Sequence, residues 1–181
     1  MGVFYEAPHW THEDFYAFLL LQRIYGNYSI EMLNESLGEV EKQHNTLHEF
    51  VKQVPDLERY DCVYSPYSDC GIFGHYFCGS PEYSNHMSYI GGVIGEIMSN
   101  KLSDEEVNRA KHKLYHELLS VQAISDIMQQ YGPQYIYLNR KVPRSEIAGR
   151  ISLMDTDYLR GICKKWFVDK QPSYTNWGPS G

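Results

Sequence analysis

The sequence predicts one α+β domain, in which an antiparallel-rich sheet is backed by helices. Its 181 residues, of which 43% are hydrophobic, suffice for one domain with a sizeable core and are too few for two ordinary domains. Two β-type runs, residues 60–64 and 71–78, follow each other around a turn at residues 67–69. Most of the remaining chain places apolar residues at helical spacing. Strands that come in a pair, rather than in strict alternation with helices, favour α+β over α/β.

The N-terminal part of the chain predicts a strand and then a helix. Residues 3–5 form a short β-type run. Thr11 is followed three residues later by Asp14, so Thr11 is the expected N-cap of the first helix. That helix covers the apolar residues 15–24 and ends at Gly26.

A second helix is expected within residues 31–54, before Pro55 ends the pattern. Its apolar positions recur at helical spacing: Val40, Leu47, Val51 and Val54. The two strands of the hairpin follow, and the second of them carries most of the large apolar side chains: Ile72, Phe73, Tyr76 and Phe77.

The next segment predicts two long helices. The pair Ser80-Pro81 is a favourable helix start, because proline at the first helical position loses no hydrogen bond. This helix presents one apolar face: Met87, Ile90, Ile94 and Ile97. Ser103 and Glu106 form a capping box that opens a second helix, which is expected to run to about Gln130 before Pro133 interrupts it. The apolar residues of this helix form one stripe: Val107, Ala110, Leu114, Leu118, Val121 and Met128. Four of them are expected to be buried: Val107, Leu114, Leu118 and Val121.

Two shorter helices and an extended segment complete the prediction. The first helix is marked by Ile147, Ile151 and Met154. Thr156 is the expected cap of the second helix, whose inner face carries three residues: Leu159, Ile162 and Trp166. Residues 172–177 are short and aromatic, so they are expected to be extended.

Composition excludes several classes of function. Sixteen Lys and Arg against twenty-three Asp and Glu give a formal charge of −7, which argues against binding to nucleic acid or to an anionic membrane. No apolar run approaches the roughly 18 residues of a membrane-spanning helix. The cysteines are too few for a disulfide scaffold and form no C-x-x-C pair, so buried free thiols are expected: Cys62, Cys70, Cys78 and Cys163.

Two His-x-x-x-His pairs have a spacing that zinc can use: His44 with His48, and His112 with His116. His112 and His116, however, lie opposite the apolar stripe of their helix. Neither pair has the glutamate of a His-Glu-x-x-His motif or of the reversed motif. A solvated helix face is therefore the preferred interpretation.

No other pattern supplies a catalytic set. There is no Gly-x-Ser-x-Gly nucleophile elbow, and residues 71–74 begin a strand instead of opening a phosphate-binding helix. Gly91, Gly92 and Gly95 lie inside a helix, where the close approach of another backbone is the expected compensation. The sixteen tyrosines suit a protein interface, and equally a buried core. We therefore expect no catalytic, cofactor-binding or metal-ligating residue in this chain, and no cofactor.

Five sequence blocks resemble a known family and occur in its order: EAPHWTHED at 6–14, YSDCGIFGHYF at 67–77, SDEEVNRAK at 103–111, NRKVP at 139–143, and Gly178-Pro179. They resemble the second half of mitochondrial processing-peptidase subunits and of the related core subunits of the cytochrome bc1 complex. Both groups belong to the pitrilysin-like metallopeptidase superfamily. The first two blocks are more similar to the beta-type, or core 1, branch than to the alpha type.

The chain departs from the family in two places. Gly132-Pro133-Gln134 stands where the family has Gly-Arg-Gln, so an arginine is lost, and residues 31–61 match no family block. The family's zinc motif, His-x-x-Glu-His with a distal glutamate, lies in the first half of a full-length subunit. The resemblance therefore implies no zinc chemistry by this chain, which is not expected to be an enzyme on its own.

The resemblance implies that residues 1–181 form a single half-subunit domain that packs opposite the catalytic domain and helps to enclose the substrate chamber. The favoured function is that of a core 1-type structural subunit of respiratory complex III, peripheral on the matrix side of the mitochondrial inner membrane. The alternative is the non-catalytic half of an active processing peptidase whose zinc half is another polypeptide. An unrelated, free-standing binding module is a third and less favoured interpretation.

The implied partners are a polypeptide carrying the first half, an alpha-type (core 2) subunit and other complex III subunits. Because Met1 falls one strand before Trp10, the chain is expected to be a separate polypeptide that needs a first-half companion. Alone, it is expected to expose an apolar, aromatic patch and to aggregate or bind hydrophobic dye. The tyrosines and the helix with Gly91, Gly92 and Gly95 are the candidates for that patch.

Overall fold

The computed structural model describes residues 1–29, 54, 56–120 and 124–178. The expected helix at 31–54 and the pair His44 and His48 lie outside these residues, as does Val121. In chain order the elements are β1 (Gly2–Ala7), α1 (Phe15–Tyr25), β2 (Asn27–Ser29), β3 (Leu57–Pro66), β4 (Gly71–Gly79), the short 3-10 helix η1 (Pro81–Tyr83), α4 (Ser84–Lys101), α5 (Asp104–Ser120), α6 (Ile124–Leu138), α7 (Arg144–Ser152), α8 (Thr156–Trp166) and β5 (Ser173–Thr175).

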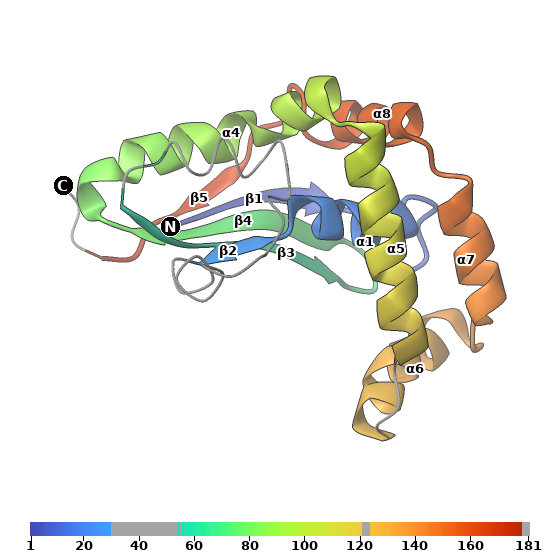
Figure 1. Ribbon diagram of the computed structural model, residues 1–181. Helices are drawn as coiled ribbons and strands as arrows, with labels where there is room; N and C mark the ends of the chain where they lie inside the picture. The colour runs from blue at the N-terminus through green and yellow to red at the C-terminus, as the bar shows by residue number, and fades with distance from the viewer. Residues whose placement is uncertain (30–53, 55, 121–123, 179–181) are drawn as a thin grey trace, which may run out of the picture.

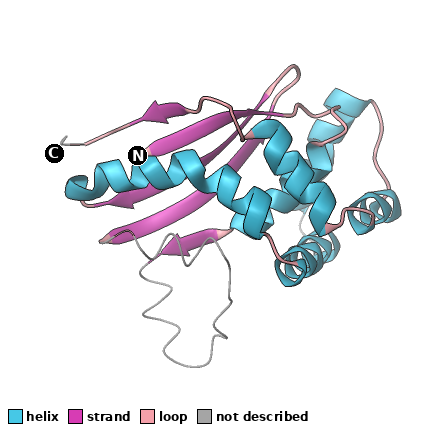
Figure 2. Cartoon of the chain, turned by 90° about the horizontal axis from the view of Figure 1, so that it is seen from above, coloured by secondary structure: helices cyan, strands magenta, loops and turns pink. Residues whose placement is uncertain are grey.

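The strands form one antiparallel sheet in the order β2-β3-β4-β1-β5, so the predicted α+β fold is confirmed. The hairpin of β3 and β4 is also confirmed, and its turn is closed by the Tyr67 N–H, which donates to the Cys70 carbonyl at 2.8 Å. β2 was not predicted, because a strand of three residues is too short to show alternation. The last strand, β5, lies within the segment expected to be extended and forms one edge of the sheet (Figure 2).

One face of the sheet is buried and the other is open. Inward-facing residues of the three central strands are buried: Val3, Tyr5, Ala7, Tyr60, Cys62, Tyr64, Phe73, His75 and Phe77. Helices α4 and α8 lie on this side (Figure 1). On the opposite face Val63, Ile72 and Tyr76 are exposed, although they are apolar or aromatic. The open face is therefore more apolar than a surface that only meets water requires.

Phe73 lies at the centre of the buried core. Its ring is edge-on to Phe18 of α1 at a centroid distance of 5.2 Å and tilted against Phe167 at 5.4 Å. Tyr25 and Tyr64 complete the ring cluster, at 5.4 and 6.2 Å. Strand β4, helix α1 and the residue that follows α8 are thus joined by aromatic contacts in one core.

Helix α1 begins at Phe15, so the prediction that Thr11 caps it is wrong. The Thr11 hydroxyl instead lies 2.9 Å from Nδ1 of His9 in the turn before the helix. Asp14 occupies the N-cap position but makes no capping bond with its side chain, because its carboxylate is held by residues of α8. The predicted end at Gly26 is confirmed, and its φ of 65° explains the glycine.

Helix α4 buries Met87, Ile90 and Ile94 as predicted, but Met98 takes the place expected for Ile97. Gly91 and Gly95 lie on the same side and are buried. A Cβ on Gly91 would lie 2.4 Å from the Val3 side chain, and one on Gly95 would lie 2.2 Å from Cβ of Phe167. The glycines therefore admit side chains of β1 and of the segment after α8. The expected close approach of another backbone is therefore wrong for Gly91 and Gly95, and neither of these two glycines is part of an exposed patch.

Replacing Gly95 with alanine is expected to lower the free energy of unfolding by about 1–3 kcal/mol, because the added methyl group overpacks the contact with Phe167. The matched control is Gly161→Ala on α8, where no atom lies within 4 Å of the added Cβ. That change should leave stability unchanged or raise it by up to about 1 kcal/mol through helix propensity. Urea unfolding of both variants measures the difference, and equal effects would contradict the packing assigned to Gly95.

The capping box that opens α5 is confirmed. The Ser103 N–H donates to Glu106 Oε2 at 2.9 Å, and the Glu106 N–H donates back to Ser103 Oγ at 3.3 Å. Val107 and Leu114 are buried as predicted, and Leu118 packs partly buried against the core. A single helix running to Gln130 is wrong, because α5 ends at Ser120 and α6 lies at an angle to it (Figure 1).

Helix α6 leaves Met128 exposed, so the predicted apolar stripe does not continue along it. Pro133 lies inside α6 and does not interrupt it, contrary to prediction. Proline has no N–H, so the carbonyl of Gln129, four residues earlier, loses its helical hydrogen bond. Gln129 is exposed, so water can bind this carbonyl instead.

The last two helices agree with prediction except at one cap. Ile147 and Ile151 are buried on α7, and Met154 is buried just after it. The N-cap of α8 is Asp155, not Thr156: its side chain accepts a hydrogen bond from the Tyr158 N–H at 2.7 Å. The Thr156 hydroxyl instead donates to Asp104 of α5.

Candidate functional site

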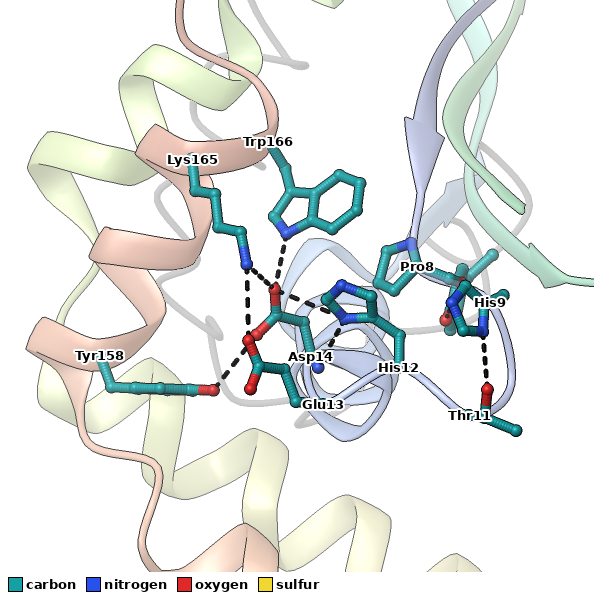
Figure 3. Close-up of polar contacts among 10 residues, drawn as sticks. Pro8, His9, Thr11, His12, Glu13, Asp14, Tyr158, Lys165 and Trp166 are labelled. Atoms are coloured by element: carbon teal, nitrogen blue, oxygen red, sulfur yellow. Dashed lines mark hydrogen bonds and ion pairs between the residues drawn. The ribbon is translucent and has the colours of Figure 1, made fainter. Parts of the chain in front are cut away.

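The most strongly organised polar site surrounds Asp14, a carboxylate that is only 2% exposed (Figure 3). Its Oδ2 accepts hydrogen bonds from Lys165 Nζ at 2.6 Å and from the Trp166 indole N–H at 2.9 Å. The Tyr158 hydroxyl lies 3.5 Å from Oδ1. All three partners belong to α8, so the site joins the beginning of α1 to the last helix.

His12, in the turn before α1, is also part of the site. Its Nδ1 accepts a hydrogen bond from the Asp14 N–H at 3.0 Å, and its ring is edge-on to Trp166 at 5.5 Å. The same Nδ1 lies 3.7 Å from Oδ2 of Asp14.

The electrostatics of the site favour an ionised Asp14. Burial raises the pKa of the carboxyl, but hydrogen bonds from Lys165 and Trp166, together with the positive charge of Lys165, outweigh burial and lower that pKa below 3.8. The hydrogen bond to Asp14 raises the pKa of Lys165 in turn. Each charge therefore stabilises the other at neutral pH.

This pair makes the stability of the domain depend on pH in acid. A carboxyl whose pKa is lowered by folding contributes stability above its unfolded pKa and loses it as pH falls through the folded pKa. The difference in free energy of unfolding between the native chain and Asp14→Asn is therefore expected to shrink below about pH 4. The control is Asp157→Asn, which alters an exposed carboxylate and should change stability little at any pH. A difference for Asp14→Asn that stays constant down to pH 2 would contradict the assignment.

A shallow hollow of about 250 Å³ opens beside this site. It is lined by Glu13, Tyr16, Arg150, Leu153, Met154 and Tyr158. The Arg150 guanidinium lies over the Tyr16 ring at 5.5 Å and also pairs with Glu146 at 2.9 Å. The Arg150 guanidinium is thus already engaged within the chain.

The turn between α6 and α7 contains the NRKVP block. Arg140 binds Glu146 through two hydrogen bonds of 2.8 and 2.7 Å, which, with Arg150, lower the pKa of Glu146 to about 2. The Val142 N–H donates to Gln134 Oε1 at 2.9 Å, so the glutamine of the Gly-Pro-Gln segment fixes this turn to α6. The block therefore has a structural role within the domain.

The residues weighed as possible ligands or nucleophiles do not converge. His112 and His116 are both exposed on α5, as predicted for a solvated face. Cys62 and Cys163 are buried, and burial raises the pKa of Cys163 to about 12, but Cys70 is exposed, so the prediction of buried thiols is wrong there. Within the described ranges, no three His, Cys, Asp or Glu side chains are grouped so that they could hold a metal ion.

Sequence reasoning missed two buried polar groups, the carboxylate of Asp14 with its partner Lys165 and the imidazole of His75. Asp14 and Lys165 are separated by 151 positions, so no local spacing could have joined them. His75 is buried in β4 with its Nδ1 2.9 Å from the Tyr60 hydroxyl, and burial lowers its pKa to about 3. The alternation of β4 was the available signal, since it places His75 on the same face as Phe73 and Phe77.

The contacts of this site join two helices of the domain. Asp14 is held by partners of its own chain, and the exposed Glu13 carboxylate lies 3.9 Å from the same Lys165 ammonium. No helix in the same residues is both long and apolar enough to cross a bilayer. Fold and site together define an α+β domain in which a buried polar centre holds the first and last helices together.

Comparisons with known proteins show what this domain is similar to. No family profile matches the chain. Its fold matches that of a chain in the structure "Complex III2 from Candida albicans, Inz-5 bound", with a TM-score of 0.78 at 15% identity over 91% of this chain and 39% of that one.

By sequence, the chain is a distant homologue of mitochondrial-processing peptidase beta subunits and of subunit 1 of the cytochrome b-c1 complex, over a partial region of those proteins. It is 24% identical over 185 residues to the Bos taurus beta subunit and 26% identical over 171 residues to that of Caenorhabditis elegans. These alignments cover 99% and 93% of this chain and 36% of each relative. Subunit 1 of the Mus musculus cytochrome b-c1 complex is 28% identical over 115 residues, which is 62% of this chain and 24% of that protein. The chain thus spans about a third of the length of the curated relatives.

Proposed function

We propose that this chain is a structural domain of a core 1-type subunit of mitochondrial respiratory complex III, peripheral on the matrix side of the inner membrane. The observation that carries the proposal is the agreement of two comparisons: a fold shared over 91% of the chain with a chain of complex III, and distant homology to the beta-type branch. The saturated Asp14 site supports a role in assembly, because it offers no group for catalysis.

The proposal includes a companion domain of the same family, carried by a first-half polypeptide, and contacts with an alpha-type subunit. The open face of the sheet supports it, since Val63, Ile72 and Tyr76 are exposed there without a covering helix among the described elements. Residues 1–181 then act as one domain, whose open sheet face meets the companion.

An active processing peptidase is the second candidate, with this chain as its non-catalytic half. The acidic balance favours it, because a formal charge of −7 would attract basic presequences. The partner's sequence separates the two candidates: an intact His-x-x-Glu-His there supports the peptidase, and a degenerate motif supports the core role.

The proposal is tested by purifying the tagged chain from its native source in mild detergent and identifying its partners by mass spectrometry. We expect stoichiometric complex III subunits together with a first-half companion. Recovery of the chain alone, or with proteins of neither assembly, would overturn the proposal. The purified chain alone should not cleave basic presequence peptides with added zinc, and chelator-sensitive cleavage would show that it is an enzyme by itself.

A further inference from the structure

Helix α6 carries an exposed apolar stripe on the side that faces away from the domain. At 100° per residue, the stripe falls within an arc of about 120°. Four large apolar side chains of the stripe are more than half exposed: Ile124 at 80%, Met128 at 65%, Tyr135 at 56% and Ile136 at 73%. Gly132 lies in the middle of the stripe.

The orientation of this stripe is fixed by Gln134, which lies on the opposite side of α6, and by Tyr131, which lies at the edge of the stripe. Gln134 is buried and accepts the Val142 N–H at 2.9 Å, and the buried Tyr131 receives a hydrogen bond from Arg144 Nε at 3.2 Å. The Lys141 ammonium lies over the Tyr131 ring at 4.3 Å. The helix is therefore anchored both opposite the stripe and at its edge, and the exposure of Met128 and Tyr135 is a property of the fold.

Gly132 allows another helix to come close. No atom of the described chain lies within 4 Å of a Cβ built on Gly132, so nothing inside the domain requires a glycine there. Glycine in the middle of a helix lowers its stability relative to alanine. A small residue at the centre of an apolar stripe lets two helices cross with their backbones close together.

We propose that the α6 stripe is a self-association surface that pairs with α6 of a second copy of this chain. The two helices run antiparallel about a two-fold axis at Gly132, which places Met128 of each copy against Tyr135 and Ile136 of the other.

Two properties of the stripe favour a second copy over an unrelated partner. Its apolar positions lie four residues before Gly132 and three and four residues after it, so a two-fold axis at Gly132 brings apolar side chains together on both sides. The sequence of α6 contains one charged residue, Asp126. Two copies of a chain with a formal charge of −7 repel each other least at such a surface.

Sedimentation equilibrium of the full chain, over a range of micromolar concentrations, tests the proposal. We expect a reversible change from one copy to two. Gly132→Leu should raise the dissociation constant at least about tenfold, because it blocks the close crossing. It should leave thermal unfolding of the domain unchanged or improved, because a Cβ at this position has no neighbouring atom within 4 Å and leucine favours a helix more than glycine does. Met128→Lys should weaken association as well, by placing like charges in the interface.

The matched control is Gly149→Leu on α7, another helical glycine with no atom within 4 Å of its added Cβ. This variant should associate like the native chain. A native chain that stays single at all concentrations would overturn the proposal, and so would a Gly132→Leu variant that pairs normally. A third outcome is that the pure native chain stays single and the α6 variants lose a companion found in the native assembly. The stripe would then bind that companion, so self-association would be wrong while the proposed function stands.

Discussion

Replacing Lys165 with methionine is expected to lower the free energy of unfolding by about 3 kcal/mol, the largest effect of any single surface-accessible charge in this domain. The cost arises at Asp14, which is 2% exposed and would remain charged and buried without its cation. The Trp166 N–H would still bind the carboxylate, which keeps the effect at the lower end of the range for broken buried pairs.

A double-mutant cycle isolates the pair. Asp14→Asn alone is expected to cost about 1–3 kcal/mol, because it weakens charge-assisted hydrogen bonds but leaves Lys165 able to reach water. The double variant should be more stable than the sum of the two single effects predicts, by at least about 1 kcal/mol. Lys164→Met removes the neighbouring, exposed charge and serves as the control. Strict additivity in urea unfolding would mean that the two charges do not interact as described.

Replacing Phe73 with alanine is expected to cost about 3–5 kcal/mol, because it opens a cavity at the point where β4, α1 and Phe167 meet. The neighbouring residue offers a matched control: Ile72 is 40% exposed on the open face, and Ile72→Ala should change stability by less than about 1 kcal/mol. Thermal or urea unfolding compares the two variants. A small effect at Phe73, or an equal one at Ile72, would contradict the assignment of buried and open faces.

The elements of the fold that could be predicted are those whose signals are local. Ser103 and Glu106 are three residues apart and form the predicted capping box, and the alternation around Phe73 predicted β4. Prediction failed where distant contacts decide. Thr11 has the local features of a cap, but α1 begins at Phe15, and the N-cap residue Asp14 directs its carboxylate to Lys165 of α8.

The functional part of the prediction depended on the resemblance more than on chemistry. The sequence correctly indicated an antiparallel α+β domain related to beta-type processing-peptidase and core 1 subunits. The glycines of α4 were expected at a surface, because a helical pattern does not reveal which neighbour fills the space. Val3 and Phe167, which fill it, lie more than 70 positions away along the chain. The exposure of the α6 stripe could not be predicted for the same reason, because an apolar helical face has the same sequence pattern whether it is buried or exposed.

The order of the strands has a consequence for synthesis. β1 lies between β4 and β5, and Asp14 pairs with Lys165. Both β1 and the start of α1 therefore need partners, β5 and α8, that are synthesised much later. A nascent chain that has not yet released α8 from the ribosome holds β1 with one neighbour and α1 with an unpaired carboxylate. At about 5–20 residues per second, this state lasts for several seconds after α1 emerges. The native sheet and the Asp14–Lys165 pair can therefore be completed only after α8 and β5 have been synthesised.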